Sequence, residues 1–209
     1  VITSADIQKA HLGPIPHNPV PSTNYDLKLR APDGTRPTVD AHYLLPEDRV
    51  RYVGEAVAMV VAESLQQALD AVEAVIVDYF VLPHITESKD AILPDAPQFY
   101  EHIENNVLID TQFGDEVLTE KAFASAVHIF EHEFHIQRVT GVTMEPRSAL
   151  GSFDVDTGKF TLVAGSGGAV RQQSEIAAVL RIDASDIRVI SPDVGGNFGT
   201  RNRVYIEFG

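Results

Sequence analysis

The chain has 209 residues, of which 44% are hydrophobic, and its 30 acidic side chains against 16 basic ones give a formal net charge of −14. This composition is typical of a globular protein with a buried core, and the excess of acid argues against nucleic acid or an anionic membrane as a partner. The absence of cysteine excludes disulfides, thiolate metal sites, iron–sulfur ligation and a nucleophilic thiol from these residues.

The sequence also lacks the signals of membrane insertion and secretion. No stretch approaches the roughly 18 apolar residues of a membrane span, and the first residues lack the basic start and apolar run of a signal peptide. We therefore expect no membrane span and a cytoplasmic location. The chain begins on Val1 rather than Met, and it stops shortly after a glycine-rich loop. We accordingly expect a fragment of a longer polypeptide.

The first half of the chain predicts a long loop followed by a strand–helix–strand unit. Residues 11–49 are rich in proline, which favours an irregular surface excursion. Residues 57–62 and 75–81 are apolar runs typical of strands. Between them, Ser64 and Gln67 have the spacing of a capping box that begins a helix. Apolar residues then recur on one helical face, namely Leu65, Ala68, Leu69 and Val72.

The second half begins after a polar, proline-containing linker, residues 83–106. Asp115 can cap a short helix that ends near Ser125, and residues 127–139 have the pattern of an extended strand. Residues 149–154 and 159–164 are predicted to form a hairpin. A helix is predicted over residues 169–180 and a strand over residues 187–190.

Residues 128–135 (HIFEHEFH) contain residue types that bind zinc or iron. On a strand, side chains alternate between faces, so His128 and His132 lie opposite Glu131, Glu133 and His135. The candidate ligands are divided, and the segment lacks a compact helical metal motif. We interpret it as a strand with polar and packing positions rather than as a metal site.

Two charged residues follow in the segment 143–151. Glu145 could be a general base, but it precedes Pro146 and no partner can be assigned to it, which favours a structural role. Arg147 could bind an anionic ligand or form a salt bridge with Glu145 or another acid. The sequence does not separate these alternatives for Arg147.

A first glycine loop, residues 165–168 (GSGG), lies between a predicted strand and a predicted helix. That arrangement lets free helix amides and a closely approaching backbone hold a phosphate. It also matches half of a dinucleotide fingerprint, although the sixth position is Val170 rather than a small residue. The alternatives are a nicotinamide-dinucleotide site, a tight turn, and a contact loop for another cofactor.

A second glycine loop, residues 195–199 (GGNFG), directly follows the last predicted strand and Pro192. Glycines permit positive φ and close backbone approach, and Phe198 can project an apolar ring toward a ligand. Taken alone, this loop is either a ligand contact or a tight turn.

Several of these segments together resemble one enzyme family. Residues 51–63, the helix after them and residues 77–83 are similar to the small α/β-hammerhead domain of the large subunits of xanthine dehydrogenase, aldehyde oxidase and carbon monoxide dehydrogenase. Residues 144–147 (MEPR) and 193–201 (DVGGNFGTR) resemble the opening segments of the molybdopterin-binding domain of the same family. The resemblance covers most of the chain and is weakest in the proline-rich loop.

The resemblance implies which residues lie near a cofactor. In the family, the phenylalanine and glycine of the second loop lie at the molybdenum site, and they correspond here to Phe198 and Gly199. Many members carry a glutamine in the first loop, at a position that an ungapped count places at Gly167, so this glutamine is absent. Xanthine-type members have a carboxylate where this chain has Asn202, which argues against a purine substrate.

The resemblance therefore predicts an α+β protein with two incomplete domains, an α/β-hammerhead domain over residues 1–100 and the start of a molybdopterin-binding domain over residues 106–209. The expected cofactor contacts are Gly167, Gly168, Gly196, Phe198 and Gly199, with no catalytic residue and no direct metal ligand in this fragment.

The complete enzyme implied by the family is a molybdenum-dependent oxidoreductase. It oxidises an aldehyde, carbon monoxide or an N-heterocycle with water as the oxygen source, through attack of a metal-bound hydroxyl assisted by a base. Its partners are an FAD-binding medium subunit and a 2Fe-2S small subunit. The family's base glutamate has no counterpart here, so we expect the fragment alone to be inactive and to retain no cofactor. The alternatives are a small NAD(P)-dependent oxidoreductase that uses residues 165–168 and a non-catalytic binding or assembly module.

Overall fold

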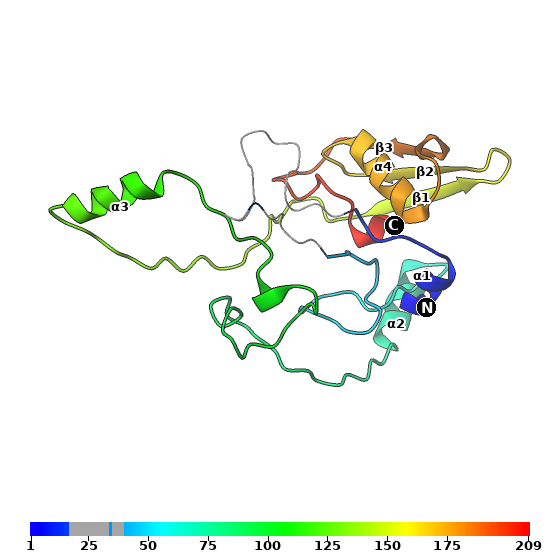
Figure 1. Ribbon diagram of the computed structural model, residues 1–209. Helices are drawn as coiled ribbons and strands as arrows, with labels where there is room; N and C mark the ends of the chain where they lie inside the picture. The colour runs from blue at the N-terminus through cyan, green and yellow to red at the C-terminus, as the bar shows by residue number, and fades with distance from the viewer. Residues whose placement is uncertain (17–33, 35–39) are drawn as a thin grey trace.

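The computed structural model describes residues 1–16, 34 and 40–209. Figure 1 shows a small sheet with one helix packed on it, and a long excursion that carries a helix away from the sheet. The helices are α1 (Ser4–Lys9), α2 (Leu65–Glu73), α3 (Glu116–Ser125) and α4 (Ala169–Leu180). The strands are β1 (Ala149–Asp154), β2 (Lys159–Ala164) and β3 (Ile187–Ile190). Short 3₁₀ turns are η1 (Glu104–Asn106), η2 (Ala184–Asp186) and η3 (Ile206–Phe208).

The sheet has the order β1-β2-β3 and is mixed. β1 and β2 pair antiparallel as the predicted hairpin, with Ala149 opposite Ala164. Its turn is held by the Asp154 carboxylate, which accepts from the backbone amide of Asp156 at 2.9 Å, and it closes on Gly158 at φ 68°. β2 and β3 run parallel, with α4 as the crossover between them. Parallel strands need such a crossover, and the predicted strand–helix–strand order supplies it.

The core lies between α4 and this sheet. Ile176 and Val179 of α4 are buried with Leu162 of β2 and Ile187 of β3. The two ends of the chain complete the same cluster, because Ile15 and Phe208 belong to it. Apolar burial on this scale is the main favourable contribution to folding. The core therefore holds the carboxyl ends of β2 and β3 at one edge of the sheet.

The N-terminal segment joins this core through a close backbone approach. The Gly13 amide donates to the carbonyl of Val179, at the end of α4, at 2.7 Å. A Cβ at position 13 would lie 2.9 Å from the carbonyl oxygen of Ala178, so the approach requires glycine. Residues 1–16 are thereby tied to α4 although more than a hundred residues separate them along the chain.

The predicted helices are confirmed, and their caps are those expected from the sequence. The Ser64 hydroxyl accepts from the Gln67 amide at 3.3 Å at the start of α2. The Asp115 carboxylate accepts from the Leu118 amide at 2.9 Å at the start of α3. α1 was not predicted, because its 6 residues are too few to show an apolar period. The structure describes the predicted loop over residues 11–49 only at its two ends and at residue 34.

Three predicted strands are wrong. Residues 57–62, 75–81 and 127–139 are extended, but none of them joins a ladder with another described residue apart from one bridge, in which Met59 pairs with Ile2. The hydrophobic pattern reports an extended backbone, whereas a strand also needs a neighbour for its amides and carbonyls. Within the described ranges no such neighbour is present, and Phe130 is accordingly 94% exposed.

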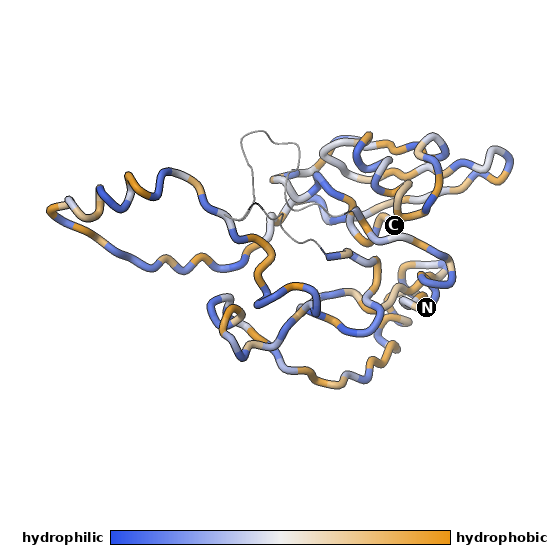
Figure 2. The backbone as a smooth tube through the Cα atoms, viewed as in Figure 1, coloured by the Kyte–Doolittle hydropathy of each residue, from blue (hydrophilic) through white to orange (hydrophobic). Residues whose placement is uncertain are grey.

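Figure 2 shows hydrophobic residues recurring along the excursion and along the lower stretches of the chain. The apolar stripe of α2 also faces solvent, with Leu65 exposed to 75%. No helix within residues 1–16 and 40–209 is long and apolar enough to cross a membrane. The exposed apolar residues are therefore spread along extended chain and a short helix.

The hairpin turn yields a pH-dependent prediction. Its hydrogen bonds, first that of the Thr157 side chain and then those of the Asp156 and Thr157 amides, lower the pKa of Asp154 from its ordinary value of 3.8. A carboxyl group whose pKa is lower in the folded than in the unfolded state stabilises the fold. This stabilisation is complete above the unfolded-state pKa and is lost as the pH falls through the folded-state pKa. Asp154→Ala should therefore lower the melting temperature near neutral pH, and the wild-type and variant curves should converge below pH 3.8.

Asp156→Ala is the matched control, because it removes the same charge from the same exposed turn without removing the acceptor of the turn amides. Melting curves recorded by circular dichroism between neutral and acid pH make the comparison. Equal effects of the two substitutions at neutral pH would show that Asp154 acts through charge alone.

Candidate functional site

The two glycine loops lie side by side at the edge of the sheet where β2 and β3 end. Residues 165–168 follow β2, and residues 195–199 follow β3 after a short connection. Parallel strands place their carboxyl ends at the same edge, which is where open α/β sheets bind ligands. The loops are joined directly, because the Ser166 amide donates to the Ser191 hydroxyl at 3.1 Å and the Gly167 amide donates to the carbonyl of Arg201 at 2.8 Å.

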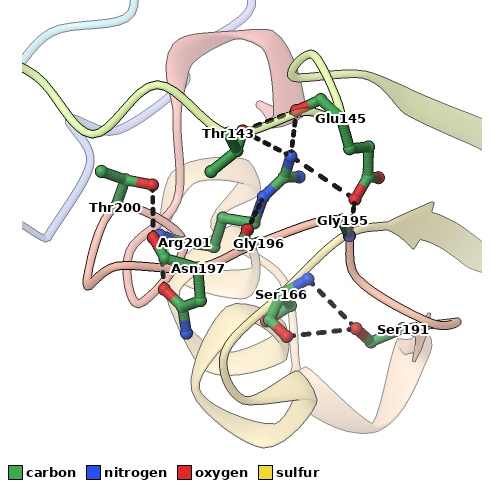
Figure 3. A network of polar contacts seen from close by, with 9 residues as sticks. All are labelled: Thr143, Glu145, Ser166, Ser191, Gly195, Gly196, Asn197, Thr200 and Arg201. Atoms are coloured by element: carbon green, nitrogen blue, oxygen red, sulfur yellow. Dashed lines mark hydrogen bonds and ion pairs between the residues drawn. The ribbon is translucent and has the colours of Figure 1, made fainter.

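The guanidinium of Arg201 is the centre of this arrangement (Figure 3). Its Nε donates to the carbonyl of Gly196 at 2.9 Å. Its Nη2 donates to the Thr143 hydroxyl at 3.2 Å and to the carbonyl of Glu145 at 2.5 Å, and it lies 3.5 Å from the Glu145 carboxylate. The Arg201 side chain is 2% exposed. A single buried cation thus joins the second glycine loop to the segment that precedes β1.

Glu145 has a structural position in this network, as the sequence favoured. Its carboxylate accepts from the Gly195 amide at 2.6 Å, and its own amide donates to the carbonyl of Gly195 at 3.4 Å. The carboxylate therefore both pairs with Arg201 and holds the second loop. Bonds of this kind, with one charged partner, are stronger than neutral ones.

Close packing or backbone conformation favours glycine at three positions of the two loops. A Cβ at Gly165 would lie 2.5 Å from Nη1 of Arg201, and one at Gly195 would lie 2.5 Å from Cβ of Glu145. Gly196 has φ +113°, a conformation that side chains rarely adopt. The sequence indicated close approach at these glycines, and the structure identifies the partners as the chain's own side chains.

Phe198 is held in an unusual backbone conformation at the exposed end of the second loop. Its φ is 49°, and its side chain is 78% exposed. A non-glycine residue in the left-handed region costs on the order of 1–3 kcal/mol, and such residues cluster at ligand sites. The loop beneath it is held by the Thr200 amide and hydroxyl, which donate to the carbonyl of Asn197 at 2.8 and 2.7 Å. Phe198, with its strained backbone, therefore belongs to a turn that these two hydrogen bonds stabilise.

The start of α4 adds free donors to the same face. The first amides of a helix have no partner within it, and its N-cap, Gly168, has no side chain that could accept from them. The helix dipole adds partial positive charge at this end. Gly167 and Gly168 are exposed here. The face formed by these residues can bind an anionic or oxygen-rich ligand.

Two buried polar side chains at this site have atoms without a hydrogen-bond partner among the described residues. They are Nη1 of Arg201 and both amide atoms of Gln172. Gln172 lies one turn before Glu175, whose carboxylate accepts from Arg203 at 2.9 Å and from the Val204 amide at 3.0 Å. The sequence analysis missed Gln172. The available signal was its place on the inward face of α4, three residues before Glu175.

The other charged candidates do not join this face. Arg147 forms an ion pair with Glu207 at 3.5 Å and lies over the ring of Tyr205 at 4.3 Å. This settles its pairing in favour of an acid other than Glu145. Residues 128–135 lie on the excursion that carries α3 (Figure 1), and within residues 1–16 and 40–209 no group of three or more metal-binding side chains is assembled.

Comparison with known families gives two matches that together span most of the chain. Residues 99–208 match the molybdopterin cofactor-binding domain. Residues 3–83 match the a/b hammerhead domain of aldehyde oxidase and xanthine dehydrogenase. Both glycine loops and the Arg201 network fall within the first match.

Individual relatives agree with these matches. The carbon monoxide dehydrogenase large chain of Hydrogenophaga pseudoflava is 29% identical over 178 residues, which cover 79% of this chain and 22% of the relative. A probable xanthine dehydrogenase subunit of Bacillus subtilis is 30% identical over 164 residues, covering 78% and 22%. The structure of reconstituted CO dehydrogenase from Oligotropha carboxidovorans superposes with a TM-score of 0.79 at 26% identity, covering 99% of this chain and 25% of that chain. The chain thus spans about a fifth to a quarter of the length of these proteins.

The Arg201 network predicts a large local effect of one substitution. Arg201→Met should destabilise the second loop by about 1–3 kcal/mol, because it leaves the carbonyls of Gly196 and Glu145 without their buried donor. Glu145→Gln keeps an acceptor for the Gly195 amide and should cost less. Hydrogen exchange of the amides of residues 195–200, measured together with the melting temperature, reports both effects.

Arg147→Met is the matched control. It removes the same charged group from a partly exposed pair with Glu207, whose side chains are 49% and 40% exposed. Such a pair contributes about 0–1 kcal/mol. If Arg147→Met opened the second loop as much as Arg201→Met, the central role of Arg201 would be refuted.

Proposed function

Because this chain belongs to the family of molybdopterin-binding large subunits of xanthine dehydrogenase, aldehyde oxidase and carbon monoxide dehydrogenase, we propose that its two glycine loops form one wall of a molybdenum cofactor site. The proposed contacts are Gly167 and Gly168 of the first loop and Gly196, Phe198 and Gly199 of the second. The observation that carries the proposal is that the first glycine loop, which begins α4 with free amides, lies against Asn197 of the second loop, the loop that carries the strained, exposed Phe198.

The residues present fit such a cofactor. A pterin with a phosphate group presents anionic oxygens and a flat ring system. Free amides at the start of α4 suit the oxygens, and the exposed backbone of Gly167 and Gly168 permits close approach. The buried cation of Arg201, with one unpaired nitrogen against Gly165, adds positive charge behind the loop.

In the complete protein, the molybdenum cofactor supplies two-electron oxidation of an aldehyde, carbon monoxide or an N-heterocycle, with water as the oxygen source. The residues of this chain bind and orient the cofactor and do not themselves react. The loop amides hold the cofactor, and the Phe198 ring presents an apolar surface that excludes water from one side of the site. We assign no proton-transfer step to the described residues.

These 209 residues contain no cysteine, so none of them holds an iron–sulfur cluster. We propose an FAD-binding medium subunit and a 2Fe-2S small subunit as partners. The relatives named above are described as a large chain and as a subunit, wording that belongs to multi-subunit enzymes. We retain the boundary between residues 100 and 106 as the proposed division between the two domains.

The alternative of a small NAD(P)-dependent enzyme has less support from the geometry. A dinucleotide fingerprint uses its glycines to bring backbone close to the pyrophosphate. Here the space beside Gly165 is taken by the side chains of Arg201 and Glu145, and the space beside Gly167 by those of Asn202 and Asn197. The other alternative is a non-catalytic assembly module. The molybdenum content of the protein distinguishes such a module from an enzyme.

The test is the molybdenum content of the intact enzyme, meaning the full-length large subunit purified with its partner subunits. We expect stoichiometric molybdenum in the intact enzyme by mass spectrometry of the metal, and no heat of binding when NAD or NADP is titrated into the 209-residue chain by calorimetry. The 209-residue chain expressed alone should retain no molybdenum. An intact enzyme without molybdenum, or micromolar dinucleotide binding, would contradict the proposal.

Gly196→Ala probes the site within the same enzyme. The substitution forces a side chain into a backbone at φ +113°, within 3.1 Å of the Phe198 ring. We expect bound molybdenum to fall several-fold at an unchanged yield of soluble protein. Gly54→Ala is the control, because it imposes similar strain at φ +91° with nothing within 4 Å of the new Cβ. Equal losses in the two variants would mean that strain alone causes the effect.

A further inference from the structure

The buried side of α4 changes from polar to apolar along the helix. Gln172, Glu175, Ile176 and Val179 are all buried, and their spacing places them on one helical face. Ile176 and Val179 belong to the apolar core beneath the helix. The other two are polar, and they come earlier in the helix, nearer to the first glycine loop. A buried polar side chain is costly unless its hydrogen bonds are made, so its partners carry information.

Glu175 has its partners in the chain that leaves the second glycine loop. The residue is 6% exposed. One carboxylate oxygen accepts from Nη1 of Arg203 at 2.9 Å, and the other accepts from the Val204 amide at 3.0 Å. Both oxygens are thus used on two consecutive residues that follow the second loop. A single acid of α4 holds the end of that loop.

The same stretch of chain is fixed by further contacts. The carbonyl of Arg201 accepts from the amide of Gly167 at 2.8 Å. The Val204 side chain is buried in the core between α4 and the sheet. Val204 is therefore fixed twice, through its side chain by the core and through its amide by Glu175. Residues 201–204 are consequently tied to the first glycine loop at one end and to α4 at the other.

α4 thereby links the two loops through one regular element. The helix begins directly after the first glycine loop, and Glu175 lies on its second turn. The Arg201 side chain ties the second loop to residues 143–145, which lie outside α4. Glu175 adds a side-chain contact from the helix that begins at the first loop. The position of the second loop relative to the first thus depends on this carboxylate.

We infer that Glu175 is a positioning residue of the cofactor site. Its ion pair with Arg203 and its bond to the Val204 amide hold the end of the second glycine loop at a fixed place relative to the first loop. This inference rests on the function proposed above. Glu175 is buried and acts through residues 201–204. Two loops that are fixed before binding lose little freedom when the ligand arrives, so more of the contact energy contributes to affinity.

Glu175→Met in the intact enzyme tests the positioning role. The substitution keeps the bulk of the side chain but removes the acceptor for Arg203 and for the Val204 amide. Amides of residues 195–202 should exchange with deuterium about tenfold faster, the usual effect of losing a hydrogen bond. Molybdenum retained after dialysis against a chelator should fall several-fold. Glu175→Gln keeps an acceptor for the Val204 amide, so it should recover most of both quantities.

Gln173→Met is the matched control for loss of stability. Gln173 lies on the same helix, and its side-chain amide donates to the carbonyls of Ala184 at 2.9 Å and Ile187 at 2.6 Å. These bonds lead to the beginning of β3, at the opposite end of that strand from the second glycine loop. Gln173→Met should lower the melting temperature much as Glu175→Met does. It should leave the exchange of residues 195–202 and the retained molybdenum at the wild-type level.

A second pair of variants tests the ion pair. Arg203→Met leaves the buried carboxylate of Glu175 without this cation, and an unpaired buried charge is more costly than an absent pair. Arg203→Met should therefore speed exchange of residues 195–202 more than Glu175→Gln does. Adding Glu175→Gln to Arg203→Met removes the unpaired charge, so the double variant should exchange more slowly than Arg203→Met alone.

Equal effects of Glu175→Met and Gln173→Met on loop exchange and on retained molybdenum would overturn the inference. So would a Glu175→Gln enzyme as impaired as Glu175→Met, or effects of Glu175→Gln and Arg203→Met that simply add. Any of these outcomes in an enzyme that contains molybdenum would leave the proposed function intact. Absence of molybdenum from the wild-type enzyme would overturn the proposed function and, with it, the role of Glu175 in the cofactor site.

Discussion

The buried guanidinium of Arg201 is the interaction on which the candidate site depends. It brings together residues 143–145 and 195–201, which are more than fifty positions apart. A cation with 2% of its side chain exposed is stable only when its donors are satisfied and a counter-charge is near. The carbonyls of Gly196 and Glu145, the Thr143 hydroxyl and the Glu145 carboxylate meet most of that requirement. Gly165 leaves room for the cation, because a Cβ at that position would lie 2.5 Å from Nη1 of Arg201.

The fold prepares this interaction by putting both loops at one edge of the sheet. β2 and β3 are parallel, and α4 returns the chain between them, so each loop begins where a strand ends. The core of Leu162, Ile176 and Val179 fixes the helix over the sheet. The first glycine loop, which begins α4, then lies against Asn197 of the second loop. A rigid sheet edge and two adaptable loops are a common way for a fold to position a binding site.

The remainder of the described chain has a different character. Segments 57–62, 75–81 and 127–139 are extended and largely exposed, and they carry apolar residues such as Phe130 and Phe134. The chain spans 22% of the length of the carbon monoxide dehydrogenase large chain that it resembles. The hydrophobic pattern in these segments predicted strands, and that prediction was wrong. The pairing that makes a strand is absent from the described residues, and pairing is not a local property.

What the sequence by itself determined is local chemistry. Capping residues such as Ser64 and Asp115, the hairpin turn, the helix of residues 169–180 and the glycine loops all follow from short-range geometry, and the family resemblance rests on the same short motifs. Only the tertiary structure decided that Arg201 is buried against Glu145, that Gln172 is buried without a hydrogen-bond partner among the described residues, and that Asn202 lies in the space beside Gly167. Those contacts join residues far apart in the chain, and no local pattern carries information about which distant side chain fills a given space.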